Sequence, residues 1–163
     1  MDFTIEQRLT GSPDAVLGVL LDPGFVAARA ALPKLGDPAL VESTRDGDRA
    51  RQRIRLRFTG ELSSAVTAAV DPARLTWIDD AQYDLRAHTA THTIEPDHYA
   101  DRLSCSYDEA ITAEGAGSRR VLRGLVKVRI LLVGGRVEGA IVSGFREHAE
   151  AEATLIDDWL ARA

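Results

Sequence analysis

Residues 134–163 read GGRVEGAIVSGFREHAEAEATLIDDWLARA, a run without proline and, after Gly144, without glycine. Apolar or small side chains recur along it at steps of three and four residues, which is the spacing of one face of an α-helix. We therefore predict one long amphipathic helix that must bury this face against another element. The face consists of Val137, Ile141, Gly144 or Phe145, His148, Ala151 or Glu152, Leu155 and Trp159.

Most of the preceding chain alternates apolar and polar side chains, the pattern of half-buried strands. Two short helices interrupt it, each opened by a capping residue and a proline, at Ser12-Pro13 and Asp22-Pro23. Residues 61–70 fit a strand or, by their alanine content and apolar spacing, a helical turn. The expected strands are residues 3–9, 40–46, 49–58, 75–85, 87–95, 101–113 and 118–133.

Short turns join successive strands from residue 40 onward, which indicates an antiparallel sheet. Seven twisted strands curl, and a long helix on the concave face leaves a space between helix and sheet. We therefore predict an α+β fold with one domain over residues 1–163. A curved seven-stranded antiparallel sheet would surround the C-terminal helix, and the two short helices would close one end.

Charge, cysteine content and hydrophobic runs indicate which partners and cell compartments are not expected. The formal charge is −5 and the pI is about 5.4, so nucleic acid is not an expected partner. Cys105 is the only cysteine and cannot form an intrachain disulfide. The N-terminus lacks the pattern of a signal peptide, and the longest strongly apolar run, Ile130 to Val133, is far too short for an integral membrane segment. We expect a cytoplasmic protein without a cofactor.

The order of elements resembles the helix-grip fold of the START-like (SRPBCC) superfamily, which includes the Bet v 1 allergens, polyketide cyclase-like proteins and lipid-transfer domains. Three segments more narrowly resemble an actinobacterial family of unknown function, DUF2505: MDFTIEQ at residues 1–7, Asp22-Pro23-x-Phe25, and ALPKLG at residues 31–36. This resemblance implies a pocket for an apolar or amphipathic small molecule, lipid- or polyketide-like. It implies no particular chemistry, because one fold serves many functions.

The expected cavity between sheet and helix has apolar walls and a few polar groups that orient a ligand. His92 and His148 are the predicted polar anchors. No residue is assigned as catalytic, but an alternative is a polyketide cyclase-like enzyme in which His148, His92 or Glu152 acts as acid or base. The predicted ligand-binding residues are Ile54, Phe58, Trp77, His92, Tyr107, Val126, Val128, Ile141, Phe145 and His148.

Several polar or small residues occupy positions that should face inward, and the sequence allows more than one environment for most of them. Glu109 is expected at the pocket mouth in water, or else paired with a pocket cation, because an unpaired buried carboxylate is costly. His148 and Glu152 are neighbours on the helix and have two interpretations: an acid–base pair that faces the cavity, or, if the apolar face turns outward here, two solvated side chains. Cys105 is expected to be an apolar filler rather than a nucleophile. Gly139 and Gly144 leave room either for a ligand or for close packing on the sheet.

Two further patterns suggest sites at first sight. His88 and His92 fall on one face of a strand about 13 Å apart, from a rise of about 3.3 Å per residue, so they cannot share a metal, and we predict no metal site. Five arginines alternate along residues 49–57. They are expected to form a solvated outer face with ion pairs to Asp80 and Asp84 on the next strand. A third hypothesis uses this arginine face for protein binding.

Overall fold

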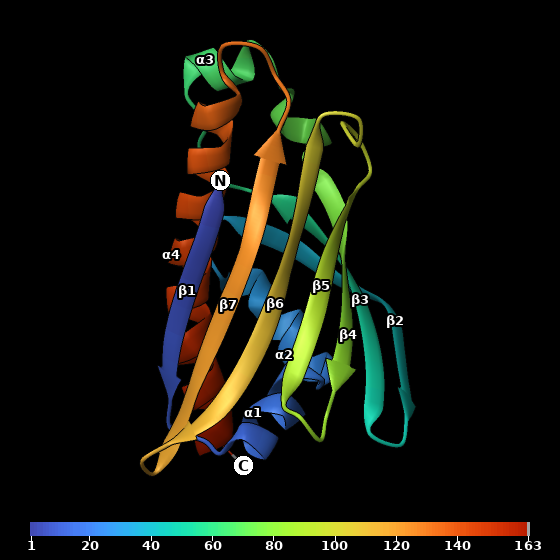
Figure 1. Ribbon diagram of the computed structural model, residues 1–163, viewed down its shortest axis with the longest axis vertical. Coiled ribbons are helices and arrows are strands. Elements are labelled where there is room, and N and C mark those ends of the chain that lie inside the picture. Colours follow the sequence, from blue (N-terminus) through green and yellow to red (C-terminus); the bar gives the residue numbers. More distant parts are fainter. Residues whose placement is uncertain (163) are drawn as a thin grey trace.

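The computed structural model describes residues 1–162 and contains a seven-stranded sheet with a long C-terminal helix on one side (Figure 1). The elements, in chain order, are β1 (Asp2–Leu9), α1 (Pro13–Leu20), α2 (Pro23–Ala28), η1 (Arg29–Ala31), β2 (Leu35–Asp46), β3 (Arg49–Phe58), α3 (Ser64–Thr67), η2 (Pro72–Arg74), β4 (Thr76–Asp84), β5 (Thr89–Pro96), β6 (Leu103–Glu114), β7 (Gly117–Val128) and α4 (Gly134–Ala161).

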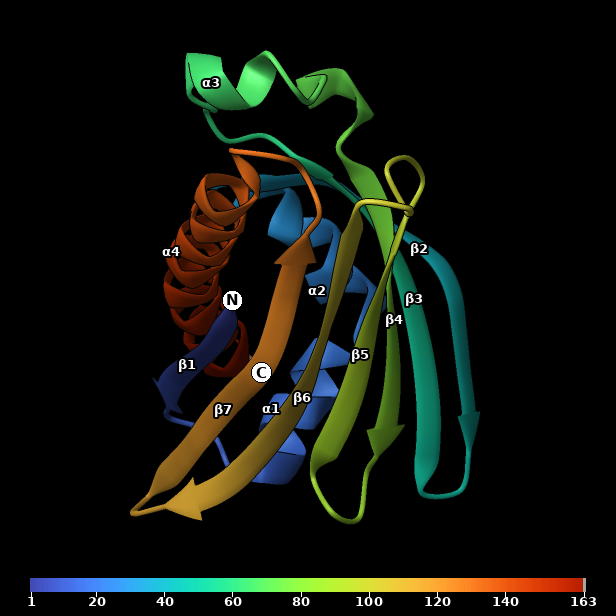
Figure 2. The same cartoon turned by 45° about the horizontal axis from the view of Figure 1, so that its top comes forward.

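The strands follow the order β1-β7-β6-β5-β4-β3-β2, and every neighbouring pair is antiparallel. The first strand therefore pairs with the last, and the remaining strands form a meander. Figure 2 shows the sheet curved around α4, α1 and α2, which lie on its concave side. This arrangement confirms the predicted α+β helix-grip fold.

Most element boundaries agree with the sequence pattern, and the exceptions are confined to strand ends and turns. The last strand ends at Val128 rather than 133, so Ile130 to Val133 form a loop. Strand β2 begins at Leu35 rather than at residue 40. The turn expected at Gly36 lies within this strand, where the register of its pairing with β3 shifts between Gly36 and Ala39. His88 lies in the turn before β5 with a φ of 53°, so it does not share a strand with His92. Residues 61–70 contain the helical turn α3.

The predicted caps hold the short helices in place. The Ser12 hydroxyl accepts a hydrogen bond from the Ala15 amide at 3.3 Å, and Asp22 accepts one from the Gly24 amide at 2.7 Å. The second carboxylate oxygen of Asp22 accepts a hydrogen bond from the Trp159 indole at 3.2 Å. The capping residue of α2 therefore also ties that helix to the end of α4.

The interior divides into two main apolar clusters. In one, α1 and α2 pack between the sheet and the C-terminal half of α4, where Ile156 is fully buried and Trp159 packs beside Phe25. In the other, the N-terminal half of α4 and the segment around α3 face Phe3 and Tyr107. The short helices thus fill one end of the sheet solidly, as predicted.

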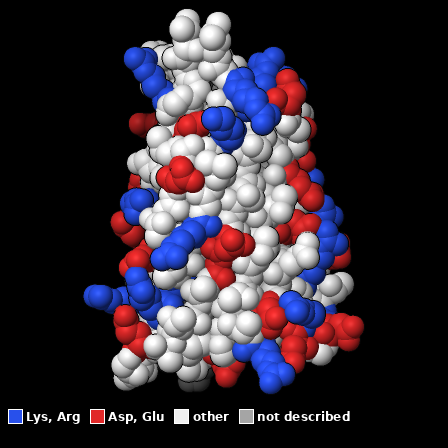
Figure 3. Space-filling model, in the orientation of Figure 1, with Lys and Arg blue, Asp and Glu red and all other residues white. Residues whose placement is uncertain are grey.

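The five alternating arginines of β3 face outward, and each pairs with a carboxylate. Arg49 contacts Asp84 at 3.1 Å, and Arg51 donates to Asp80 at 2.9 Å. Figure 3 shows the resulting mixture of positive and negative groups along the β2–β4 side. The remaining pairs are Arg53 with Asp80 and Glu95, Arg55 with Asp97, and Arg57 with Asp37. These contacts confirm the predicted ion pairs with Asp80 and Asp84 on the outer face, and an exposed pair such as Arg49 with Asp84 is worth at most about 1 kcal/mol.

Within residues 1–162, no helix combines the length and apolar character that crossing a membrane requires.

Candidate ligand cavity

A cavity of about 140 Å³ lies between the N-terminal half of α4 and the concave face of the sheet. The segment around α3 and the β5–β6 and β7–α4 loops, which lie together at one end of the molecule (Figures 1 and 2), line its outer end. Its wall is mostly aliphatic and aromatic, with contributions from Leu56, Phe58, Leu62, Val66, Val70, Leu75, Trp77, Ile94, Tyr99, Leu103, Cys105, Tyr107, Val126, Val128, Ile130, Val137, Ile141 and Phe145.

Polar groups occur at the two ends of this apolar wall. Arg74, His98 and Arg102 line the outer end and are exposed, so the cavity opens to solvent there. The Arg74 guanidinium lies 3.3 Å from His98 Nδ1 and 5.3 Å from the centre of the Tyr99 ring. At the inner end, Arg29 and Asp79 form part of the wall. The cavity is therefore apolar along its length and charged at both ends.

Three residues predicted to bind ligand lie away from the wall. Ile54 packs with Val26 and Leu56 in a separate small cluster. His92 lies behind Tyr107, with the two rings stacked at 4.2 Å. His148 turns towards η1, where its Nδ1 donates to the Pro33 carbonyl at 3.0 Å. The predicted residues that do lie in the wall are Phe58, Trp77, Tyr107, Val126, Val128, Ile141 and Phe145.

One continuous part of the wall that the sequence did not predict comes from the segment between β3 and β4. Leu62, Val66 and Val70 lie on one side of the turn at α3 and point into the cavity. Their spacing was visible in the sequence, but nothing in it placed this segment over the end of the sheet. Tyr99, from the β5–β6 loop, completes this cover.

The glycines of α4 serve two purposes. Gly144 lies in the cavity wall, and a Cβ there would meet Phe58 at an ordinary contact distance of 3.5 Å. Gly134 instead allows close packing, because a Cβ there would lie 2.6 Å from the Val128 carbonyl oxygen. On the facing strand, a Cβ at Gly124 would collide with the Ser106 carbonyl and with Tyr107. The aromatic wall therefore depends on a glycine beside it.

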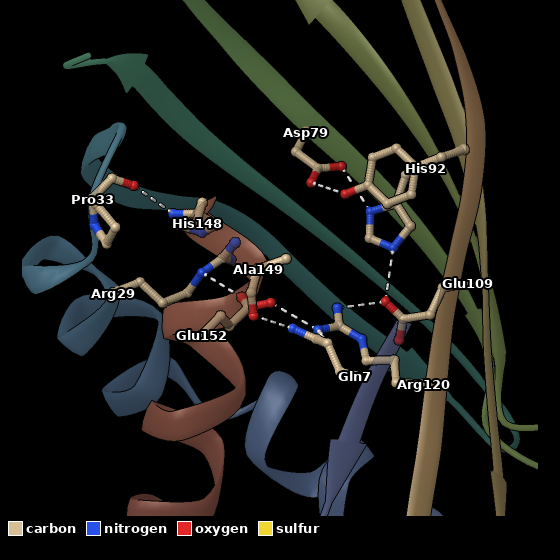
Figure 4. Close-up of polar contacts among 11 residues, drawn as sticks. Gln7, Arg29, Pro33, Asp79, His92, Glu109, Arg120, His148, Ala149 and Glu152 are labelled. Carbon is tan, nitrogen blue, oxygen red and sulfur yellow. Dashed lines mark hydrogen bonds and ion pairs between the residues drawn. The ribbon is translucent and has the colours of Figure 1, made fainter. Parts of the chain in front are cut away.

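A buried polar network forms the inner end of the cavity (Figure 4). The Tyr107 hydroxyl donates to one oxygen of Asp79 at 2.9 Å, and His92 Nδ1 contacts the other at 2.9 Å. The Nε2 of His92 lies 3.5 Å from Glu109. The network thus begins in the cavity wall with Asp79 and Tyr107, and it continues to His92 and Glu109, which do not line the cavity.

Arg120 links this group to α4. Its guanidinium donates to Glu109 at 2.6 Å, to Glu152 at 2.7 Å and to Gln7 at 2.9 Å. Arg29 approaches the second oxygen of Glu152 at 3.1 Å. Three cationic groups (Arg29, Arg120 and protonated His92) then match three carboxylates (Asp79, Glu109 and Glu152), so the network is neutral as a whole.

The electrostatics follow from this pairing. Burial alone would lower the pKa of His92, but Asp79 and Glu109 outweigh it and raise the pKa to about 9. Burial would raise the pKa of Glu109, but Arg120 and His92 hold it at about 2. Glu152 also has a pKa of about 2, because Arg29 and Arg120 outweigh its burial. All three groups are therefore charged at neutral pH.

These contacts correct two expectations. Glu109 is 2% exposed rather than in water at the mouth, and it takes the alternative role of partner to a cation, Arg120. His148 and Glu152 are buried rather than solvated; Arg29 and Arg120 neutralise Glu152, and burial lowers the pKa of His148. Arg120 was recognisable only by parity, since it falls on the inward side of β7 with Leu122 and Val126.

The chemistry available at the cavity is limited but specific. Burial and the carboxylate of Asp79 raise the pKa of Tyr107 well above its ordinary value, so its hydroxyl stays protonated. Burial also raises the pKa of the Cys105 thiol to about 12, which makes it a poor nucleophile. Within residues 1–162, no three histidine, cysteine, aspartate or glutamate side chains are arranged to hold a metal ion.

The sequence matches the family described as "Protein of unknown function (DUF2505)" over residues 4–160, and the chain belongs to that family. No curated protein sequence matches it.

Solved structures share its fold at low identity. The protein TTHA0849 from Thermus thermophilus is 16% identical with a TM-score of 0.69, covering 99% of this chain and 98% of its own. The Zhui aromatase/cyclase from Streptomyces sp. R1128 is 13% identical with a TM-score of 0.68, and the match covers 99% of this chain and 94% of that protein's chain. Norcoclaurine synthase from Thalictrum flavum, in complex with dopamine and hydroxybenzaldehyde, is 14% identical with a TM-score of 0.66. The match covers 99% of this chain and 87% of that protein's chain. These likenesses identify the fold as the Bet v 1-like helix grip.

Proposed function

We propose that this protein binds a small amphipathic molecule in the cavity between α4 and the sheet. The observation that carries the proposal is the cavity itself, whose wall is almost entirely apolar and which opens at a polar rim. Natural ligand sites combine such walls with a few polar groups that fix orientation. Here those groups are Asp79, Tyr107 and Arg29 at the inner end.

The volume limits the size of the ligand. A cavity of about 140 Å³ is close to the roughly 150 Å³ of an engineered apolar cavity that holds benzene. One aromatic ring or a short acyl segment therefore fits inside, and a larger lipid- or polyketide-like molecule would extend through the open end past Arg74 and Arg102. Norcoclaurine synthase, which shares the fold, has been solved with two single-ring molecules, and this supports a ligand of that size.

The proposal is tested by isothermal titration with a size series of phenol, 4-hydroxybenzaldehyde, 1-naphthol and decanoate. Ala140 lies in the cavity wall on α4, so Ala140→Phe should fill the space and weaken binding at least tenfold. Ser143→Phe is the matched control, because it adds the same ring at an exposed position of the same helix. Equal binding by both variants, or no binding by the wild type, would refute the proposal.

One observation favours acid–base catalysis as a second candidate function. Asp79 and Tyr107 line the cavity and contact each other, and His92 supports Asp79 from behind. Such a group can move a proton at a bound molecule. A cyclase-type activity that Asp79→Asn abolishes, without loss of ligand affinity, would support catalysis. Unchanged activity in that variant would exclude this assignment.

A further inference from the structure

The segment from Lys127 to Arg136 reads KVRILLVGGR. Four apolar residues stand together in it, flanked by Lys127, Arg129 and Arg136, and it contains no acidic residue. This composition differs from that of the chain as a whole, which carries a net charge of −5.

The apolar residues divide between the inside and the outside. Ile130 lines the cavity and Val133 packs against the same apolar cluster. Leu131 and Leu132 are 87% and 92% exposed. The Gly134 amide donates to the Ile130 carbonyl at 2.9 Å, which closes the turn between them. Within this turn Leu132 has a φ of 69°, a conformation that side-chain-bearing residues rarely adopt. The loop therefore holds both leucines away from the protein.

No other exposed apolar side chain in residues 1–162 resembles this pair. Met1, Val41 and Leu125 are 42%, 50% and 46% exposed and lie apart in the sequence. Single exposures of that kind are common on soluble proteins. Two adjacent leucines in almost complete contact with water are not, and such exposure marks a contact surface.

The loop between β7 and α4, which carries the leucine pair, lies at the same end of the molecule as α3 and the β5–β6 loop (Figures 1 and 2), and the exposed rim of the cavity belongs to those segments. The Arg129 amide donates to the Arg102 carbonyl at 2.7 Å, which brings the rim of the cavity beside this loop. Figure 3 shows an uncharged tip at this end, with positive groups on both sides and acidic groups beside them. Arg129 and Arg136 are exposed, and within residues 1–162 the Arg102 side chain forms an ion pair only with its exposed neighbour Asp101, at 3.4 Å.

We propose that the β7–α4 loop docks on the surface of a lipid bilayer that contains anionic phospholipid. Leu131 and Leu132 would enter the interfacial layer, and Lys127, Arg129 and Arg136 would contact phosphate groups. A bilayer fits better than a folded protein partner, because two leucines on a convex tip form no groove and offer far less area than a stable protein interface buries. The proposal goes beyond ligand binding and does not require that the cavity be filled.

Co-sedimentation with vesicles tests it. The wild-type protein should bind vesicles of equal parts phosphatidylcholine and phosphatidylglycerol, and bind pure phosphatidylcholine more weakly. The double variant Leu131→Ser/Leu132→Asn should reduce partitioning about 100-fold or more, given the transfer free energy of two leucine side chains. Leu125→Ser, at a half-exposed position on β7, is the control and should bind as the wild type does. Ala140→Phe should also bind normally, which separates this test from that of the cavity.

Three results would overturn the proposal. The wild type could fail to sediment with either vesicle, or the double leucine variant could bind as well as the wild type. Sedimentation velocity could also show that the leucine substitutions convert a dimer into a monomer, in which case the loop is an interface between two copies. Because the replaced side chains are almost fully exposed, the double variant should keep the wild-type melting temperature.

Discussion

Replacing Arg120 by methionine removes the guanidinium at the centre of the buried network and keeps most of the apolar stem. Glu109, Glu152 and Gln7 would lose contacts of 2.6, 2.7 and 2.9 Å in the interior. Breaking a buried ion pair by removing one partner costs about 3–5 kcal/mol, because the other charge stays buried. We expect a loss in this range and a fall in Tm of roughly 10 °C.

The pH dependence of this loss distinguishes a charge effect from a packing effect. In the wild type, the pKa values of Glu109 and Glu152 are about 2, below the ordinary value of 4.5. Their contribution to stability is therefore complete above pH 4.5 and disappears as the pH falls towards 2. Without Arg120, only His92 opposes the burial cost of Glu109 and mainly Arg29 opposes that of Glu152. Both pKa values should therefore rise from about 2, and the variant should gain less stability than the wild type as the pH rises through the acid range. The difference between the two proteins should grow as the pH rises from about 2 to about 7.

Urea denaturation across this pH range measures the effect. Arg119→Met is the matched control, since Arg119 is the next residue of β7, faces outward and pairs with Glu6 at the surface. Its loss should cost no more than about 1 kcal/mol at any pH. The reasoning is refuted if Arg120→Met destabilises the protein no more than the control does, or if its deficit is the same at every pH.

Three further predictions concern single residues. The pKa of His92 is about 9, above its ordinary value of 6.5, so its charge stabilises the folded protein fully below pH 6.5. The free energy of unfolding should decrease by about 3 kcal/mol as the pH rises through 9. Urea denaturation should show this decrease in the wild type and not in His92→Gln. Burial raises the pKa of Cys105 to about 12, which lowers its thiolate fraction at about pH 8. Ellman's reagent should therefore react with the native protein roughly 30-fold or more slowly than with the urea-unfolded chain, and equal rates would contradict this burial. Gly124→Ala should cost about 1–3 kcal/mol in thermal unfolding through its collision with Tyr107, whereas Gly18→Ala, at an open position in α1, should slightly stabilise the protein.

The fold was predictable because its signals are local. Strand alternation, the caps at Ser12 and Asp22, and the spacing of the α4 face are each contained within about a dozen residues or repeat along one element. Seven of the ten predicted ligand-binding residues lie in the cavity wall for the same reason. Alternation decides which strand residues point inward, and the spacing of three and four residues does so for Ile141 and Phe145 on α4.

The charged interior was not predictable from these signals. Glu109, Arg120 and Glu152 come from β6, β7 and α4, and each taken alone is an ordinary charged residue on an apolar face. Only the register of β6 with β7 and the crossing of α4 bring them together. Similarly, His148 and His92 were expected at the ligand because they interrupt apolar faces, but tertiary partners, the Pro33 carbonyl and Asp79, turn them away from it.

Methyl NMR of the protein titrated with 4-hydroxybenzaldehyde tests the central claim most directly, because it shows both whether a small molecule binds and where. Ile94, Val126 and Ile141 line the cavity, whereas Ile156 lies in the solid cluster at the other end of α4. A ligand in the cavity should cause saturable shifts of the first three methyl groups and none at Ile156. Absent shifts, or shifts confined to methyl groups outside the cavity wall, would contradict it.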